Sequence, residues 1–373
     1  GSAPHEVVIA ELNCCAESSL EADPWHLWNL PGLGDASGFG CSTEEESAGP
    51  LRVLARLSHP TEVNRVVPCP FAPRLLATKA ANGAVLLFNY KSEGESEGEP
   101  QEAACSLTAP GPAVDGFALC WSRKESSLLA SGGDDGRLCI WDVDVASGTA
   151  KAPFRSHTAH KGTLCDCSFS AFEPSVLATV GDTDKELRIW DVRAGSSPQQ
   201  TKAVSEDEVL AVDWSQHQER TLATTGKDTV VRVWDLRSMA SPVRCLRGHT
   251  GDTVVVRWAP FREGILASCS VDSRVMIWDL NAREEVKQPA DGEDGDEAPP
   301  ELLFAHAGHV EGINDIAWNV DDFVMCSVAG DNNVQIWQPS TVFYLDSEGE
   351  GEEGEEEPPA KRPRSRVQPT PCS

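Results

Sequence analysis

A short pattern ending in an aromatic residue recurs along this chain, and it constrains the fold more than any other feature. Each copy reads as small residues, a turn with Gly and Asp, and an apolar run of the Leu-x-Ile-Trp type. Apolar runs on both sides of such a turn predict a β-hairpin. The visible copies span residues 77–88, 130–141, 178–190, 223–234, 267–278 and 326–337.

The spacing of the terminal aromatic residues indicates how many strands belong to each repeat. The intervals are 53, 49, 44, 44 and 59 residues, and about 44 residues is the length of a four-stranded propeller blade. The long first and last intervals contain polar insertions at 91–99 and 288–300. Residues 5–12 and 51–57 also read as strands, so we expect them to supply a seventh blade. A closed ring of blades displays loops on two faces around a central channel.

Several repeats carry a recognisable dipeptide. Four end in Trp-Asp, and Gly-His pairs lie upstream at 248–249 and 308–309. This pattern resembles the WD-repeat family. The resemblance implies an all-β, seven-bladed WD-repeat propeller in which residues 1–58 complete the ring and 59–345 hold six repeats. We expect 346–373 to be a disordered acidic and basic tail.

Charge and composition restrict the partners. The chain has 59 acidic and 31 basic residues, a formal net charge of -28, which attracts basic partners and disfavours direct binding of nucleic acid. No apolar run is long enough to span a membrane. The 13 cysteines show no zinc-ligand spacing, so we expect reduced thiols and no metal or other cofactor.

Some polar residues suggest catalysis, and they need to be weighed against the repeat. His249, Ser268, Ser270 and Asp272 form one such group, but similar groups recur in other copies. Recurrence favours a buried hydrogen-bond network within each blade over a single active site. Because the chain also lacks a phosphate-binding loop and a metalloprotease motif, the sequence predicts a binding scaffold and no enzyme.

A narrower resemblance depends on residues beyond the repeat. They are Gly38–Gly40, Glu62–Arg65, Leu76–Lys79 and Pro299–His309. Together they resemble the retinoblastoma-binding histone chaperone family, the small subunit shared by chromatin assembly, deacetylase, remodelling and Polycomb complexes. The resemblance covers about residues 5–345. It implies a scaffold whose partners are histones H3 and H4 and subunits of such complexes.

In that family an acidic loop before a double proline binds a basic helix of histone H4. The resemblance assigns this role to Asp294, Asp296, Glu297, Pro299 and Pro300. Carboxylates suit arginine, and rigid prolines offer an apolar ledge for a helix. The family's second wall is a long helix upstream of the propeller. Because residues 1–12 lack helical apolar spacing, we expect that wall to be absent from this sequence.

The family's other site is the mouth of the channel, which takes an extended basic peptide such as the histone H3 tail. Transferred by position, this site comprises Glu62, Asn64, Arg65, Asp115, Phe117 and Asp252. Three positions depart from the family: Cys165 and Gly330 replace glutamates, and Leu210 replaces asparagine. Fewer carboxylates predict weaker capture of basic side chains.

The C-terminal region joins an acidic run at 346–357 to a basic segment at 359–366. The basic segment resembles a nuclear localisation signal. Its candidate residues are Lys361, Arg362, Arg364 and Arg366. We therefore expect the protein in the nucleus.

Two other functions stay open from the sequence. Arg193 and Arg237 each complete a Trp-Asp-x-Arg element, which resembles that of substrate receptors for cullin-type ubiquitin ligases. Arginine at a strand end is also a common partner in surface ion pairs. The other alternative is an acidic WD-repeat chaperone in ribosome biogenesis, suggested by the glutamate-rich segments.

Overall fold

The computed structural model describes residues 5–12, 28–31, 51–91, 100–111, 114–150, 153–282 and 299–340. The chain divides into two units, Gly1–Pro339 and Ser340–Ser373. Every regular element of the described residues is a β-strand. This part of the chain accordingly contains no helix able to cross a membrane.

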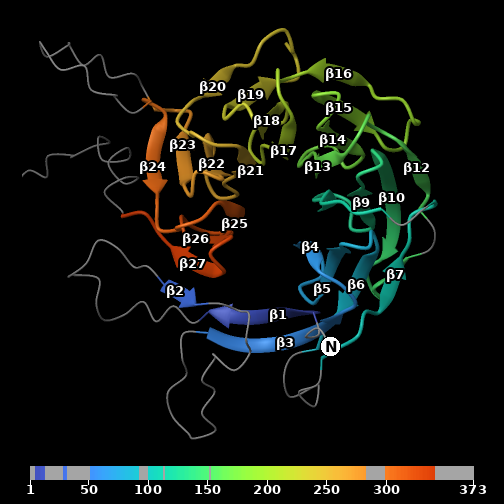
Figure 1. Cartoon of the computed structure of the whole chain (residues 1–373). Helices are drawn as coiled ribbons and strands as arrows, with labels where there is room; N and C mark the ends of the chain where they lie inside the picture. The colour runs from blue at the N-terminus through green and yellow to red at the C-terminus, as the bar shows by residue number, and fades with distance from the viewer. Residues whose placement is uncertain are drawn as a thin grey trace, which may run out of the picture. The chain divides into compact units, whose positions relative to one another are not determined.

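Antiparallel sheets follow one another around an opening in the first unit (Figure 1). The first sheet holds β4 (Val63–Pro68), β5 (Leu75–Ala80), β6 (Val85–Asn89) and β7 (Cys105–Leu107). The second holds β8 (Leu119–Trp121), β9 (Leu128–Gly132), β10 (Arg137–Asp144), β11 (Thr149–Ala150) and β12 (Arg155–Thr158). The third holds β13 (Leu164–Phe169), β14 (Val176–Gly181), β15 (Glu186–Asp191) and β16 (Gln200–Ala203).

The next sheets repeat this order. The fourth holds β17 (Val209–Trp214), β18 (Thr221–Gly226), β19 (Val231–Asp235) and β20 (Arg244–Leu246). The fifth holds β21 (Thr253–Trp258), β22 (Ile265–Ser270), β23 (Val275–Asp279) and β24 (Leu302–His306). The sixth holds β25 (Ile313–Trp318), β26 (Met325–Ala329) and β27 (Asn333–Trp337). These are six propeller blades, as the repeats predict.

Residues before the first repeat contribute in two ways. β2 (Trp28–Pro31) pairs with β27 as the outer strand of the sixth blade, a pairing that the sequence pattern does not reveal. β1 (His5–Leu12) pairs with β3 (Leu51–His59) in a separate two-stranded sheet. β3 also bonds the first blade, since Ser58 N donates to Gln101 O at 2.8 Å. The two strands expected at 5–12 and 51–57 thus form.

The apolar core lies between neighbouring blades. Trp190 packs with Leu138 and Ile140 of the preceding blade, and Trp278 packs with Val233 of the preceding blade. The small residue in the second strand of the repeat, such as Ala178, is fully buried because the blades approach closely there. The aromatic and small residues of the repeat are therefore the residues that seal the blades together.

The recurring polar residues form the buried network that the sequence predicts. In the third blade His160 contacts Asp184 Oδ1 at 3.0 Å and Thr179 Oγ1 at 2.7 Å, and Trp190 Nε1 donates to the same hydroxyl at 2.8 Å. The fifth and sixth blades repeat this arrangement. Its members there are His249, Asp272, Ser268 and Trp278, and His309, Asp331, Ser327 and Trp337. Each network links a loop, a turn and two strands.

Candidate binding sites at the two ends of the channel

The first strand of each blade lines the central channel, and five of these strands share a local irregularity at their N-terminal ends. In each of the five, one residue near this end has no paired residue on the second strand of the blade. The skipped residues are Asn64, Cys165, Leu210, Val254 and Asn314. A β-bulge bends its strand and redirects a side chain. All five residues line the same cavity.

This cavity has a volume of about 940 Å³ and lies at the N-terminal ends of the channel strands. Besides the bulged residues it is lined by the carboxylates of Asp134, Asp182, Glu208 and Asp315. Apolar walls come from Phe117, Val271 and Ile313. We call it the carboxylate cavity. It combines negative charge with an apolar floor, which suits an extended peptide that carries basic and apolar side chains.

Two groups at the carboxylate cavity, Asp134 and Cys165, have raised pKa values. Burial, Asp115 and Asp182 raise the pKa of Asp134, against the opposing effect of Lys79. Burial and the neighbouring Asp182 raise the pKa of the Cys165 thiol to about 12. Crowded like charges of this kind are relieved by a bound cation.

Three of the carboxylates already have partners. Asp315 Oδ1 accepts a hydrogen bond from Ile316 N at 2.9 Å. Asp182 Oδ1 accepts a hydrogen bond from Thr163 N at 2.9 Å, which holds the carboxylate at the cavity wall. Glu208 forms an ion pair with Lys227 Nζ at 2.7 Å, and both side chains are about 39% exposed. Such an exposed pair stabilises the fold little, so a basic ligand can compete with Lys227 for this carboxylate.

The residues expected at the channel mouth are only partly brought together. Asn64, Arg65 and Phe117 line the carboxylate cavity. Asp115 lies behind them, where its Oδ1 accepts hydrogen bonds from Asn64 Nδ2 and from Gly116 N. The structure does not place Glu62 or Asp252 among the residues that line this cavity. The side chain of Glu62 is exposed and that of Asp252 is half-buried.

The three departures from the family have different consequences. Cys165 and Leu210 are bulged residues, so their side chains give the cavity an apolar floor. At Gly330 an added Cβ would lie 2.8 Å from Glu311 Oε2. A carboxylate from the adjacent loop therefore lies beside the position where the family has a glutamate.

Sequence reasoning missed the four carboxylates that line the cavity. Asp134 and Asp182 begin the turns between second and third strands, Glu208 precedes β17, and Asp315 lies within β25. A charge inside an apolar strand, as at Asp315, is the available signal. The turns themselves look alike in every repeat, so they do not indicate which aspartates reach the channel.

The expected histone H4 loop is described only at its end. Asp294, Asp296 and Glu297 lie outside the described residues, as do Lys361, Arg362, Arg364 and Arg366. Pro299 is half-buried and Pro300 exposed, and Pro299 O accepts a hydrogen bond from Leu302 N at 2.9 Å. The double proline thus leads directly into β24, which pairs with β23.

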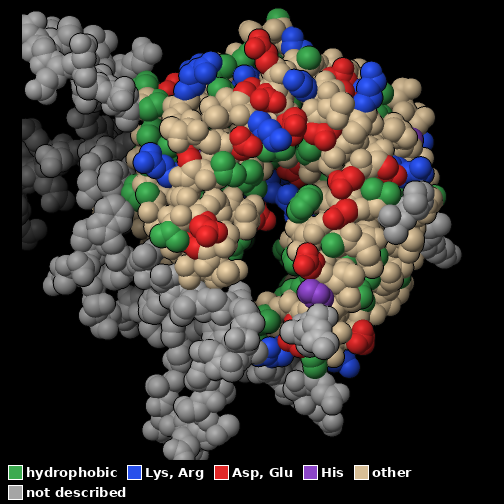
Figure 2. Space-filling model, in the orientation of Figure 1, with side chains coloured by type: hydrophobic (Ala, Val, Ile, Leu, Met, Phe, Trp, Pro, Cys, Tyr) green, Lys and Arg blue, Asp and Glu red, His purple; other side chains and the backbone are tan. Residues whose placement is uncertain are grey.

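A second cavity of about 530 Å³ lies at the C-terminal ends of the channel strands. It contains three arginines, Arg65, Arg123 and Arg257, and two aspartates, Asp166 and Asp213. Asp166 lies 3.8 Å from Arg65 Nη1 and 3.6 Å from Arg257 Nη1. Asp213 Oδ1 lies 3.8 Å from Arg123 Nη2. We call this the arginine cavity. Figure 2 shows charged side chains of both signs around the opening between the blades.

Tryptophans in this second cavity join neighbouring blades. Trp121 Nε1 donates to Val67 O at 3.2 Å, Trp258 Nε1 to Asp213 O at 3.1 Å, and Trp318 Nε1 to Arg257 O at 3.1 Å. Each bond crosses from one channel strand to that of the preceding blade. The indole N–H groups are therefore satisfied, and half-buried Trp318 offers apolar surface to the cavity.

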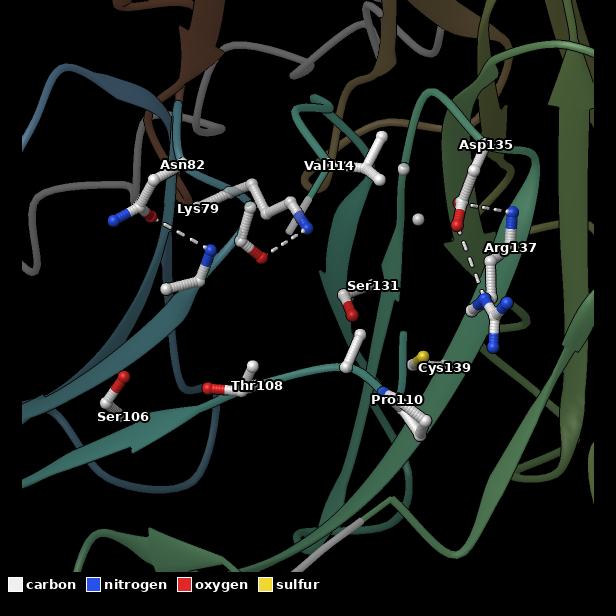
Figure 3. Close-up of a pocket in the computed structure, with 15 residues that line it drawn as sticks. Lys79, Asn82, Ser106, Thr108, Pro110, Val114, Ser131, Asp135, Arg137 and Cys139 are labelled. Carbon is white, nitrogen blue, oxygen red and sulfur yellow. Dashed lines mark hydrogen bonds and ion pairs between the residues drawn. The ribbon is translucent and has the colours of Figure 1, made fainter. Parts of the chain in front are cut away.

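A smaller pocket of about 280 Å³ lies between the first and second blades (Figure 3). The amine of Lys79 points to Gly83 O at 3.1 Å, and burial lowers its pKa. The hydroxyl of Ser131 accepts a hydrogen bond from Trp141 Nε1 at 2.9 Å. Because each group has a structural partner, the geometry assigns this pocket to the junction between blades.

Metal and disulfide chemistry is absent from the described residues. That part of the chain brings together no group of three His, Cys, Asp or Glu side chains suited to a metal. Its nine cysteines are free thiols. The Sγ atoms of Cys120 and Cys167 lie 3.2 Å apart as a hydrogen-bonded pair in the arginine cavity.

Comparison with known families agrees with this geometry. The sequence profile for the WD domain, G-beta repeat, matches residues 106–142 and 300–338. The profile described as EIPR1 beta-propeller matches residues 167–278. The chain is a WD40-repeat β-propeller protein, and its central blades are similar to the EIPR1-type propeller domain.

Proposed function

We propose that this propeller is a histone H3–H4 binding chaperone and a non-catalytic scaffold subunit of nuclear chromatin assembly or modifying complexes. The observation that carries the proposal is the carboxylate cavity, where four acidic side chains surround an apolar floor. Histone tails are extended peptides rich in lysine and arginine with small apolar residues between them. Carboxylates bind such cations through charge-assisted hydrogen bonds.

The shape of the cavity supports binding of an extended chain. Five bulges at one level widen the channel mouth and direct their side chains toward its axis. The amide of Asn314 can bond a peptide backbone. Asn64 Nδ2 already donates to Asp115 and Gly116, so Asn64 can only accept through Oδ1. Cys165, Leu210 and Val254 offer apolar contact. This mixture favours a peptide over a small ion.

The histone H4 part of the proposal depends on the double proline. Pro300 is exposed, and β24 behind it is held by β23 and by packing of Leu302 on the core. A proline ledge on a paired strand is a rigid support for the apolar face of a helix. Asp294, Asp296 and Glu297 immediately precede this ledge in the sequence. They would bind the basic side chains of the histone H4 helix.

We also propose that β1 and β3 belong to a seventh blade. They lie between the sixth and first blades in Figure 1, and Leu57 is fully buried against Leu76 and Phe88 of the first blade. This packing resembles the sealing of one blade on the next elsewhere in the ring. Nuclear import through Lys361, Arg362, Arg364 and Arg366 completes the proposal.

The ubiquitin-ligase alternative has less support. Arg193 forms an ion pair with Glu125 of the preceding blade, and Arg237 pairs with its own Asp235 at 2.6 Å. Exposed pairs of this kind are ordinary surface contacts. No geometric feature favours the ribosome-biogenesis alternative over a histone partner.

The test is isothermal titration of the full chain with a histone H3 N-terminal peptide and with a peptide of the first histone H4 helix. Replacing Asp134, Asp182 and Asp315 together by Asn should weaken H3 binding about thirtyfold, because three charge-assisted contacts are lost. The matched control replaces three exposed carboxylates elsewhere with Gln, at Glu102, Glu219 and Glu263. An equal loss of affinity in the control would show that only the net charge of the protein matters. Absence of binding to either histone peptide would refute the proposal.

A further inference from the structure

The arginine cavity lies at the other end of the channel from the proposed histone H3 site, shares only Arg65 with it among its charged residues, and has charge of the opposite kind. Three guanidinium groups face two carboxylates. The three nitrogen to oxygen distances between them are 3.6 to 3.8 Å, beyond the usual range of about 2.7 to 3.2 Å for a hydrogen bond. The arginines therefore keep donors that these aspartates do not satisfy.

The two aspartates are committed to other donors. Asp213 Oδ1 accepts from Ser168 Oγ at 3.1 Å, and Asp213 Oδ2 accepts from Trp258 N at 2.9 Å. Asp166 Oδ2 accepts from Val212 N at 3.3 Å. These bonds join neighbouring channel strands. The carboxylates therefore act first as links between blades, and the cavity keeps an excess of positive charge.

Arg123 is the arginine best placed to meet a ligand. It lies directly after β8 at the open side of the cavity, with 34% of its side chain exposed, against 13% for Arg65 and 22% for Arg257. Its Nη1 is buried and has no hydrogen-bond partner. A buried guanidinium N–H without a partner is costly, so the Arg123 side chain gains by turning this nitrogen toward an incoming acceptor.

The walls of the cavity indicate which other groups the ligand carries beside its hydrogen-bond acceptor. Trp121, Trp258 and Trp318 line the cavity, and their N–H groups bond the preceding strand. Trp318 is half-buried, whereas Trp121 and Trp258 are buried. Val320 stands at the rim with 69% of its surface exposed. Phosphates match such apolar walls poorly, whereas leucine or phenylalanine side chains bury apolar surface there.

We propose that the arginine cavity binds a short peptide segment in which acidic and large apolar residues alternate. A carboxylate of the peptide pairs with Arg123, while neighbouring apolar side chains lie against Trp318 and Val320. The net charge of -28 opposes an acidic ligand at a distance. At 0.15 M salt that field is screened beyond about 8 Å, so contact with the arginines decides binding. The propeller then has two opposite docking ends, one for basic and one for acidic partners.

The experiment measures fluorescence anisotropy of the full chain with a fluorescein-labelled peptide in which Asp and Glu alternate with Leu and Phe. The amide analogue, with Asn and Gln in place of the acids, should bind about tenfold more weakly because the charge-assisted bond is lost. Arg123→Gln should cause a similar loss. Val320→Asp, a change at an exposed rim position, should also weaken binding without affecting folding.

Two control variants change the same residue types elsewhere. Val310→Asp lies beyond the other end of β25, and Arg237→Gln lies at an exposed turn; both should leave the affinity unchanged. Equal binding of the acidic peptide and its amide analogue would overturn the proposal. So would full displacement of the peptide by millimolar inorganic phosphate, which would assign a small-anion site, or indifference to both Arg123→Gln and Val320→Asp.

Discussion

The two ends of the channel are built from the same six strands, yet they differ in regularity and in charge. At the N-terminal ends five ladders skip a residue, and the cavity of about 940 Å³ is lined by four carboxylates. At the C-terminal ends the strands are joined by tryptophan side chains, and the cavity of about 530 Å³ contains three arginines. A repeat therefore sets the scaffold, while residues that differ between repeats give each end its chemistry.

The acidic side chains of the two ends have different roles. Asp213 and Asp166 are nearly fully buried and bond groups on neighbouring strands. Asp134 is exposed at the carboxylate cavity. Buried and bonded carboxylates hold the blades together, whereas exposed ones remain available to a ligand.

The largest expected effect separates these two kinds of carboxylate. Asp213→Ala removes the acceptor for Trp258 N and Ser168 Oγ and leaves Arg123 without its counter-charge. We expect a loss of about 3 kcal/mol in the free energy of unfolding, as for other broken buried pairs. Asp134→Ala should change stability little. Thermal and denaturant unfolding of both variants measure this, and equal stability would erase the distinction between the ends.

The blades were predictable from sequence, and the two ends were not. The aromatic residue that closes each repeat, such as Trp190 or Trp278, packs its blade against the preceding one, so its spacing directly reports the architecture. β2 was missed because Trp28–Pro31 is short and pairs with β27 at the far end of the unit. No local sequence pattern predicts such a distant strand pairing.

The channel residues show the same limit. Asn64, Arg65 and Phe117 were placed at the channel by resemblance, and the structure puts them in the carboxylate cavity. The bulges at Val254 and Asn314 leave no mark in the sequence, because a skipped residue looks like any other residue of its strand. The contact between Arg65 and Asp166 joins different blades, which only the folded ring brings together.

A smaller effect tests whether the bulged positions select the ligand. Cys165→Glu adds a carboxylate at a bulge that already faces Asp182 and Glu208. We expect binding of the basic H3 peptide to strengthen about fivefold to tenfold, with a lower melting temperature from like-charge repulsion. Cys245→Glu, at an exposed position on β20, adds the same charge away from the cavity and serves as the control. Equal strengthening by both variants would show that bulged and remote charges act alike.

The smallest effect concerns pH and again distinguishes the ends, because His160 lies in the loop before β13 and His306 ends β24, both at the carboxylate end. Burial lowers the pKa of His160 from 6.5 despite the hydrogen bond and charge of Asp184; Arg188 adds to the lowering and Glu186 opposes it. Burial likewise lowers the pKa of His306, which bonds Gln335 and stacks on Trp337 at 4.2 Å. When the segment opens, its histidine regains the ordinary pKa and takes up a proton more readily than it does in the closed structure. Stability from these neutral histidines is therefore complete above pH 6.5 and declines as pH falls through the lowered values.

Amide hydrogen exchange, corrected for intrinsic rates, measures this pH response. Between pH 7.5 and 5.5 protection should fall in residues 157–163 and 306–312, while the opposite turns at 69–74 and 319–324 should keep theirs. The carboxylates of Asp272 and Asp331, whose pKa values lie below 3.8, stay ionised across this range and do not contribute to the change. Burial raises the proton affinity of each of these two carboxylates, but hydrogen bonds from neighbouring backbone N–H groups and a histidine outweigh it. In His160→Gln the pH response of 157–163 should become smaller, with His157, whose pKa burial also lowers, accounting for what is left, and that of 306–312 should remain. A uniform loss of protection over both ends would instead indicate global destabilisation, and the separate behaviour of the two ends would no longer hold.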